Sequence, residues 1–198
     1  MIYIFGYGSL IDTDCRQCTF PGEHAYAARL HGYQRYWSGL KSAEDRSAVV
    51  ITPDSNASVN GVLIPFDETF LPELDKREQD YDRVLLDIQQ LDLLDDLPGE
   101  VVKIYTYVAK EYWHPQANSP ILQTYLDVCL RGCLAVNEEY AREFLLSTNY
   151  WVNHWQDDRH QPLYPRAINM SALALEQIDS ILNDMAHLTE LKPNKSPA

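Results

Sequence analysis

Short runs of β-branched and aromatic residues recur through the first half of the chain and predict strands. The first run, Ile2 to Phe5, ends at two closely spaced glycines and is followed by a predicted short helix at residues 10–17. Further strands are expected at residues 30–37, 48–52, 59–66, 84–88 and 101–108. Turn-forming residues at 53–56 predict that the segments on either side of them pair as a hairpin.

Apolar residues at helical spacing dominate the second half of the chain. A short helix is expected at residues 67–80, an acidic loop at 91–99, and longer helices at 121–135, 137–148 and 171–188. Asn137 is the predicted N-cap of the second long helix. Strands dominate the first 110 residues and helices the rest, which predicts an α+β protein built on a small, mostly antiparallel sheet or barrel surrounded by α-helices.

The chain shows no internal repeat and no Gly/Ser-rich linker, and its 198 residues suit one domain. We therefore predict a single domain over residues 1–190 and a flexible polar tail at 191–198. Residues 151–168 crowd aromatic and charged side chains into one long segment, which is interpreted either as a structural wrap or as a lid.

The formal net charge is −13, from 16 basic and 29 acidic residues. Such a charge repels nucleic acids and anionic membranes, so neither is expected as a partner. The apolar N-terminus lacks a basic region and a cleavage site, and no apolar run approaches the roughly 18 residues of a membrane span. These features predict a cytoplasmic protein, and the sequence leaves its oligomeric state open.

Four cysteines form two pairs, Cys15 with Cys18 and Cys129 with Cys133, in distant parts of the chain. A zinc site or a redox dithiol stays an alternative, but neither pair has the glycine-rich surroundings of a zinc ribbon. Reduced and mostly buried cysteines are the preferred interpretation. The six histidines show no metal-binding spacing, so we expect neither a metal nor a cofactor.

Two segments are candidates for chemistry. In Phe5-Gly6-Tyr7-Gly8-Ser9-Leu10, two glycines after a strand let backbone N–H groups point at an anionic oxygen, although a tight turn that needs positive φ is an alternative. The segment lacks the lysine end of a phosphate-binding loop and the third glycine of a dinucleotide-binding fingerprint. The second segment, Leu74-Asp75-x-x-Glu78-x-x-Tyr81-x-Arg83, is dense in charge, which by itself is also typical of a solvated helix end.

Together, the two segments resemble the γ-glutamylcyclotransferase family, in which a Y-G-S loop and an L-D-x-x-E-x-x-Y-x-R segment build one cavity. Asn60-Gly61-Val62-Leu63 and Tyr125-Leu126, with Gly132, look like the family's intervening strand and later helix, so the resemblance covers residues 1–148. It implies a cofactor-free enzyme acting on a small γ-glutamyl substrate. The α-amine of the γ-glutamyl group would attack its own side-chain carbonyl, releasing the attached amine or peptide and 5-oxoproline.

The resemblance also implies roles for individual residues. Glu78 matches the family's catalytic glutamate, acting first as base and then as acid, which predicts a pKa raised by burial. Tyr125 is expected to hydrogen-bond near Glu78 or the substrate, and Arg83 either supports the substrate site or pairs with a neighbouring aspartate. The glutamyl carboxylate and carbonyl oxygen are expected on the backbone N–H groups around Tyr7, Gly8, Ser9 and Leu10.

The identity of the substrate stays open between glutathione, a γ-glutamyl dipeptide and a γ-glutamylamine. The first motif and Gly32-Tyr33-Gln34-Arg35-Tyr36-Trp37 look closer to the glutathione-degrading, ChaC-like branch, but Asp12 stands where that branch has tryptophan. In the lid hypothesis, Arg159 or Arg166 binds a second carboxylate of the substrate. A non-catalytic module that binds a γ-glutamyl group or another small carboxylate is the alternative function.

Overall fold

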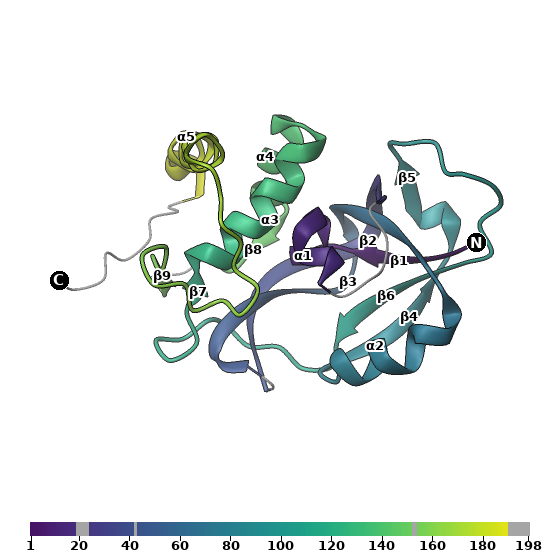
Figure 1. Ribbon diagram of the computed structural model, residues 1–198. Coiled ribbons are helices and arrows are strands. Elements are labelled where there is room, and N and C mark those ends of the chain that lie inside the picture. Colours follow the sequence, from purple (N-terminus) through teal and green to yellow (C-terminus); the bar gives the residue numbers. More distant parts are fainter. Residues whose placement is uncertain (19–23, 42, 152–153, 190–198) are drawn as a thin grey trace.

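The computed structural model describes residues 1–18, 24–41, 43–151 and 154–189. Its main sheet has seven strands in the order β4-β6-β1-β3-β2-β5, with β8 added beside β2 (Figure 1). The strands are β1 (Ile2–Gly6), β2 (Tyr26–Leu40), β3 (Ala43–Phe66), β4 (Tyr81–Leu86), β5 (Leu91–Leu93), β6 (Lys103–Ala109) and β8 (Thr148–Asn149). The β1–β6 and β2–β8 pairs are parallel and the other pairs antiparallel.

The α+β prediction is confirmed, and so is the mostly antiparallel character of the sheet. In the described residues the sheet does not close, since β4 and β5 are its two ends, so the barrel form of the prediction is wrong. Central β1 has both of its faces covered, and Tyr3, Ile4 and Phe5 are each at most 1% exposed. The candidate loop that follows β1 therefore begins from the rigid centre of the sheet.

Strands β2 and β3 form one long hairpin, in which Leu40 pairs with Ala43. Strand β3 continues unbroken through residues 53–56, so the predicted turn there is wrong. The turn-forming residues instead lie at an irregularity in the register, because His31 pairs with Ser58 while Tyr33 already pairs with Pro53. Both flanks of the segment pair with β2, so its turn propensity produces a bulge and not a chain reversal.

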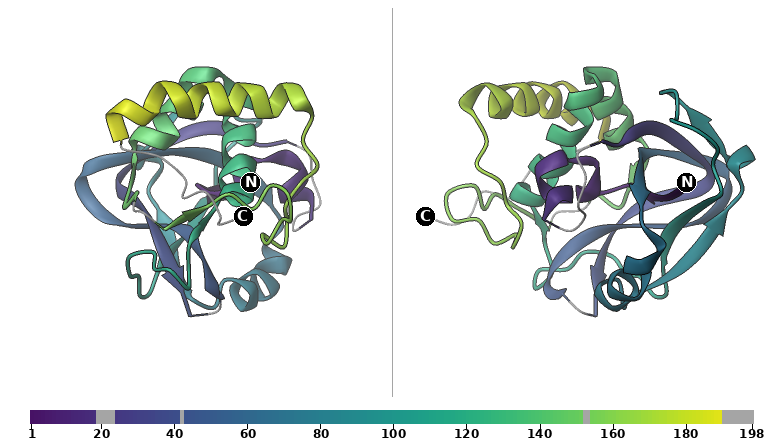
Figure 2. Two further views of the ribbon diagram at one scale, coloured as in Figure 1. Left: turned by 90° about the vertical axis from the view of Figure 1, so that its left-hand side faces the viewer. Right: turned by 45° about the vertical axis from the view of Figure 1, so that its right-hand side comes forward.

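Three longer helices gather on one side of the sheet, and α5 lies across the outer side of α3 and α4 (Figure 2). The helical segments are η1 (Ser9–Ile11), α1 (Thr13–Gln17), η2 (Glu68–Phe70), α2 (Leu71–Arg77), η3 (Ile88–Gln90), α3 (Gln123–Val136), α4 (Glu138–Leu146) and α5 (Ala172–Thr189). The predicted N-cap Asn137 is confirmed, because its side chain accepts the Tyr140 N–H at 2.8 Å. The predicted loop at 91–99 contains β5, and the helix predicted at 10–17 is divided at Asp12.

Helix α3 packs directly on the loop that follows β1. A Cβ placed on Gly132 would lie 2.5 Å from the Asp12 backbone nitrogen and 2.7 Å from the Ile11 carbonyl carbon. Asp12 caps α1 by accepting the Cys15 N–H, and it also binds Arg131 of α3 through two contacts of 2.6 and 2.7 Å. The aspartate that departs from the ChaC-like pattern thus joins the loop to α3.

The segment after α4 is tied to the start of α3. Strand β9 (Trp155–Gln156) pairs in parallel with β7 (Ile121–Leu122), and the buried Asp158 carboxylate accepts hydrogen bonds from the Thr124 N–H and hydroxyl. The tail predicted at 191–198 lies outside the described residues. Among the helices that the structure describes, none has the length and hydropathy needed to cross a membrane.

Candidate active site

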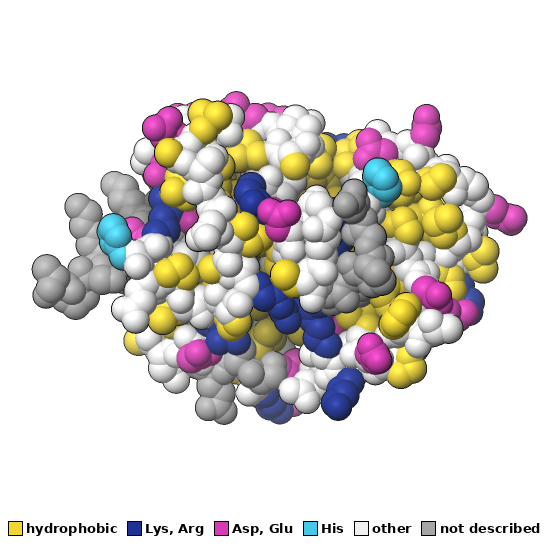
Figure 3. All heavy atoms as spheres, in the orientation of Figure 1, with side chains coloured by type: hydrophobic (Ala, Val, Ile, Leu, Met, Phe, Trp, Pro, Cys, Tyr) yellow, Lys and Arg dark blue, Asp and Glu magenta, His cyan; other side chains and the backbone are white. Residues whose placement is uncertain are grey.

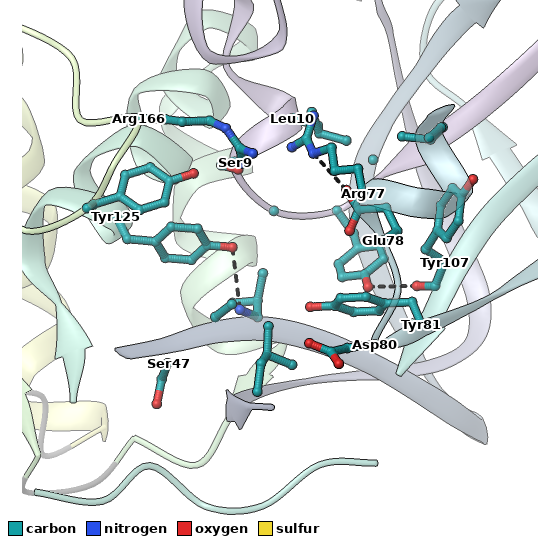
Figure 4. Close-up of a pocket in the computed structure, with 18 of the residues that line it drawn as sticks. Ser9, Leu10, Ser47, Arg77, Glu78, Asp80, Tyr81, Tyr107, Tyr125 and Arg166 are labelled. Carbon is teal, nitrogen blue, oxygen red and sulfur yellow. Dashed lines mark hydrogen bonds and ion pairs between the residues drawn. The ribbon is translucent and has the colours of Figure 1, made fainter. Parts of the chain in front are cut away.

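A cavity of about 360 Å³ lies where the loop after β1, the end of α2, the start of β3 and helix α3 meet (Figure 4). Residues 164–166 complete its wall. Basic side chains gather near the middle of the face shown in Figure 3, although the whole chain carries a net charge of −13. The cavity itself is lined by three arginines and two carboxylates: Arg46, Arg77, Arg166, Glu78 and Asp80.

The loop after β1 presents open hydrogen-bond donors. The backbone N–H groups of Gly8, Ser9 and Leu10 donate to no acceptor in the part of the chain that the structure describes. The Ile11 N–H closes the turn by donating to the Gly8 carbonyl oxygen at 2.9 Å, which starts η1. Three donors on a cavity wall form a cradle for an anionic oxygen.

Glycine is needed at position 8 for space. Gly8 has φ −135°, so the alternative of a turn with positive φ is wrong. A Cβ at this position would lie 2.7 Å from Cγ2 of Val49 and 3.0 Å from the Tyr125 hydroxyl. The close approach of β3 and α3 therefore excludes any side chain at this point of the loop.

Glu78 lies at the end of α2, where its N–H donates to the Leu74 carbonyl oxygen at 2.9 Å. Its side chain is 19% exposed, and its Oε1 is 3.1 Å from Nε of Arg77. Burial raises the pKa of Glu78 above the usual glutamate value, and Asp80 adds to the effect, while Arg77 and Arg166 act in the opposite direction. A carboxyl group with a raised pKa is suited to both accepting and donating a proton.

Three tyrosines, Tyr7, Tyr81 and Tyr107, line the cavity together with Glu78. Tyr7 donates to the Tyr107 carbonyl oxygen at 2.7 Å, and the Tyr107 hydroxyl donates to Oδ1 of Asp75 at 2.8 Å. Burial, followed by the charge of Glu78, raises the pKa of Tyr81 well above the usual tyrosine value. These phenols therefore stay neutral and add no negative charge near Glu78, and the Tyr107 carbonyl oxygen and Asp75 already accept the hydroxyl protons of Tyr7 and Tyr107.

Tyr125 lines the opposite wall from α3. Its hydroxyl accepts the Val49 N–H at 3.4 Å, and its ring contacts the ring of Tyr164 edge-on, with centroids 4.8 Å apart. Tyr164 is 7% exposed, and its hydroxyl lies 3.9 Å from Sγ of Cys15. Tyr125 therefore positions both the glycine loop and the residues that reach the cavity from the segment after α4.

Arg83 does not line the cavity. Its Nη1 is 3.0 Å from Oδ2 of Asp75, and its guanidinium lies over the Tyr105 ring at 5.1 Å from the centroid. Asp75 also accepts the Tyr107 hydroxyl, so Arg83 acts on the wall of the cavity through two intervening side chains. The other predicted site residues, Tyr7, Gly8, Ser9, Leu10, Glu78 and Tyr125, all line one cavity.

Of the two arginines in the lid hypothesis, only one lines the cavity. Arg159 binds Asp127 through two contacts of 2.7 Å and Asp179 through a third of 2.7 Å, and it does not line the cavity. Arg166 does line it. Sequence reasoning missed Arg77 and Asp80, although they flank Glu78 within the segment singled out for its charge.

No group of three metal-binding side chains converges in the described parts of the chain. All four cysteines are free thiols, and Cys15, Cys129 and Cys133 are buried while Cys18 is exposed. Burial raises the pKa of Cys15, Cys129 and Cys133, which favours the unreactive thiol form.

The fold and the cavity define an α+β protein whose site combines a glycine-containing strand–loop junction with a buried glutamate. The family model described as "Gamma-glutamyl cyclotransferase, AIG2-like" matches residues 4–126, and the chain belongs to this family. A comparison with curated proteins found no match.

Solved structures with the same fold include one described as a gamma-glutamyl cyclotransferase, at 15% identity and a TM-score of 0.61, which covers 90% of this chain and 98% of that one. An uncharacterized protein from Homo sapiens also has 15% identity, with a TM-score of 0.57 and coverage of 90% and 96%. YkqA from Bacillus subtilis has 22% identity and a TM-score of 0.53, covering 75% of this chain and 55% of its own. At these identities the likeness is one of fold.

Proposed function

We propose that this protein is a γ-glutamyl cyclotransferase that releases 5-oxoproline from a γ-glutamyl peptide or amine, with Glu78 as general base and then general acid. The observation that carries the proposal is the placement of two unlike groups in one cavity. A mostly buried carboxyl group with a raised pKa shares the cavity with the open N–H donors of Gly8, Ser9 and Leu10. The first group moves protons, and the donors stabilise negative oxygen.

The proposed reaction begins when Glu78 takes a proton from the substrate's α-ammonium group. The free amine nitrogen then attacks the γ-carbonyl carbon, forming the ring C–N bond and a tetrahedral intermediate. Collapse of this intermediate breaks the original amide C–N bond as Glu78 returns the first proton to the leaving nitrogen. The ring nitrogen then gives up its second proton to the released amine, which leaves as an ammonium ion. The products are 5-oxoproline and a free amine or amino acid, with no net consumption of protons.

The open donors have two proposed partners in this scheme, the glutamyl α-carboxylate and the oxygen of the tetrahedral intermediate. Loss of one such oxyanion donor typically slows a reaction by about 10²–10³-fold. Because the attack is intramolecular, holding the glutamyl chain in a bent conformation lowers the barrier without a covalent enzyme intermediate. Arg83, acting through Asp75 and Tyr107, is proposed as a positioning residue.

The deciding experiment measures 5-oxoproline by mass spectrometry after incubation with γ-glutamyl dipeptides, glutathione and γ-glutamylamines. We expect the wild-type protein to produce 5-oxoproline and the Glu78→Gln variant to lose this activity. No product from any substrate, with 5-oxoproline still raising the melting temperature, would overturn the proposal in favour of a binding module.

A further inference from the structure

Arg166 enters the cavity from outside the part of the chain that carries the family match. The match ends at residue 126, whereas Tyr164, Pro165 and Arg166 line the cavity from the segment after α4. Figure 4 shows the Arg166 side chain extending over the cavity toward Ser9, with its guanidinium directed at that of Arg77. The substrate would therefore meet a cation that the glycine loop and Glu78 do not supply.

The position of Arg166 is fixed by the segment that carries it. Asp158 accepts the Leu163 N–H at 2.8 Å while also binding Thr124, and the Ala167 N–H donates to the Tyr164 carbonyl oxygen at 2.9 Å. Tyr164 itself is buried against Tyr125. Arg166 is thus held by a turn that is anchored on both of its sides.

The electrostatic surroundings of Arg166 favour the binding of an anionic group. Arg166 forms no hydrogen bond and no ion pair with any residue that the structure describes. Burial lowers the pKa of Arg77, and the nearby positive charge of Arg166 lowers it further, against the effect of Glu78. Arg77 is already in contact with Glu78, whereas Arg166 acts on Glu78 only from beyond ion-pair distance. An anionic ligand group placed between the two arginines would remove the repulsion between them.

The ion pairs of the cavity arginines also favour a substrate with an additional carboxylate. Arg46 has an ion pair with Asp45 at 2.7 Å and Arg77 has one with Glu78 at 3.1 Å, whereas Arg166 has none with any described residue. A γ-glutamyl amino acid carries two carboxylates and one ammonium, for a net charge of −1, whereas an uncharged γ-glutamylamine such as γ-glutamylethylamide has a net charge of zero. The cavity therefore complements the substrate that has the additional carboxylate.

We propose that Arg166, facing Arg77, binds the carboxylate of the leaving amino acid and so selects γ-glutamyl amino acids over γ-glutamylamines. The proposal rests on the proposed function, because it assigns one carboxylate of the substrate to the open N–H groups of the loop. It goes beyond that function by naming the residue that recognises the leaving group.

The test compares binding of γ-glutamylalanine and γ-glutamylethylamide by calorimetry, in the Glu78→Gln background so that the ligand is not consumed. We expect γ-glutamylalanine to bind more tightly, and Arg166→Gln to weaken its binding by about 10- to 100-fold, as for loss of a charged hydrogen bond, while γ-glutamylethylamide is unaffected. Arg166→Lys, which keeps the charge but loses the planar fork, should restore part of the affinity. Arg46→Gln, a second arginine of the same cavity, should preserve the preference for γ-glutamylalanine.

Equal weakening of both ligands would place Arg166 on the glutamyl part and overturn the proposal. Unchanged binding of both would overturn it as well, and so would loss of the preference in Arg46→Gln and not in Arg166→Gln. Because the readout is binding, failure of the wild-type protein to release 5-oxoproline would refute the proposed function separately from this assignment.

Discussion

Replacing Glu78 with glutamine should reduce activity without reducing stability. The carboxyl group is mostly buried, and burial raises its pKa above that in the unfolded chain. A group whose pKa is higher in the folded state stabilises the fold at pH values below its unfolded-state pKa. This contribution is lost as the pH rises through its folded-state pKa. At neutral pH the ionised Glu78 therefore costs stability, at about 1.4 kcal/mol for each tenfold change in its acid dissociation constant between the unfolded and folded states. Glutamine has nearly the same shape and no charge to bury.

Catalysis should respond in the opposite sense. General acid–base catalysis by one group contributes about 10²–10⁴-fold, equivalent to about 3–5 kcal/mol of the activation free energy. We expect kcat for 5-oxoproline release to fall by that factor in Glu78→Gln. The free energy of unfolding at neutral pH should stay within about 1 kcal/mol of wild type or increase, because loss of the contact with Arg77 offsets part of the gain.

The assay pairs initial rates of 5-oxoproline release with urea unfolding, at neutral pH and again below about pH 4.3, the usual glutamate pKa. Any stability advantage of the variant should shrink at the lower pH. Glu73→Gln is the matched control, since it makes the same change on an exposed residue of the same helix, and both properties should stay at wild-type values. The reasoning is refuted if Glu78→Gln keeps activity within tenfold of wild type, or if its activity and its stability fall together.

Three further predictions concern the surroundings of the site. Gly132→Ala should destabilise the protein by about 1–3 kcal/mol, because its Cβ would meet backbone atoms of Asp12 and Ile11 that cannot move independently; an unchanged urea midpoint would contradict this. Arg159→Gln should lower the free energy of unfolding by about 3 kcal/mol, because it leaves the buried Asp127 without its ion pair. KM should not change in this variant, and a raised KM would show that Arg159 reaches the substrate. The rate should rise with pH as Glu78 ionises, and Asp80→Asn should move this limb of the kcat/KM profile to lower pH, because Asp80 raises the pKa of Glu78; a limb that does not move would mean that another group titrates.

Local sequence patterns predicted the parts of the fold that depend on local preferences. The β-branched run of β6 and the Asn137 cap are examples, since side-chain shape and a single hydrogen bond determine them. The turn expected at residues 53–56 was wrong because the long partner strand β2 determines how that segment pairs. Strand β5 was missed because its three residues are a strand only through pairing with β2.

In the candidate site, too, some features were predictable from the sequence and others depend on distant residues. The resemblance of their two motifs to the γ-glutamylcyclotransferase family predicted that Gly8 and Glu78 share one cavity, and both line it. Nothing in the sequence distinguished the role of Arg159 from that of Arg166. Two carboxylates that are distant in sequence, those of Asp127 and Asp179, bind Arg159, whereas Arg166 is directed at the cavity.

The anchoring of the segment that carries Arg166 has an evolutionary consequence. Asp158 ties its backbone to the start of α3, so the proposed recognition of the leaving group and the proposed ring closure depend on different parts of the chain. Mutations between Asp158 and Ala167 can then alter the preferred leaving group while Glu78 and the loop stay unchanged. A family built in this way can diversify its substrates by exchanging one segment and keep the same chemistry.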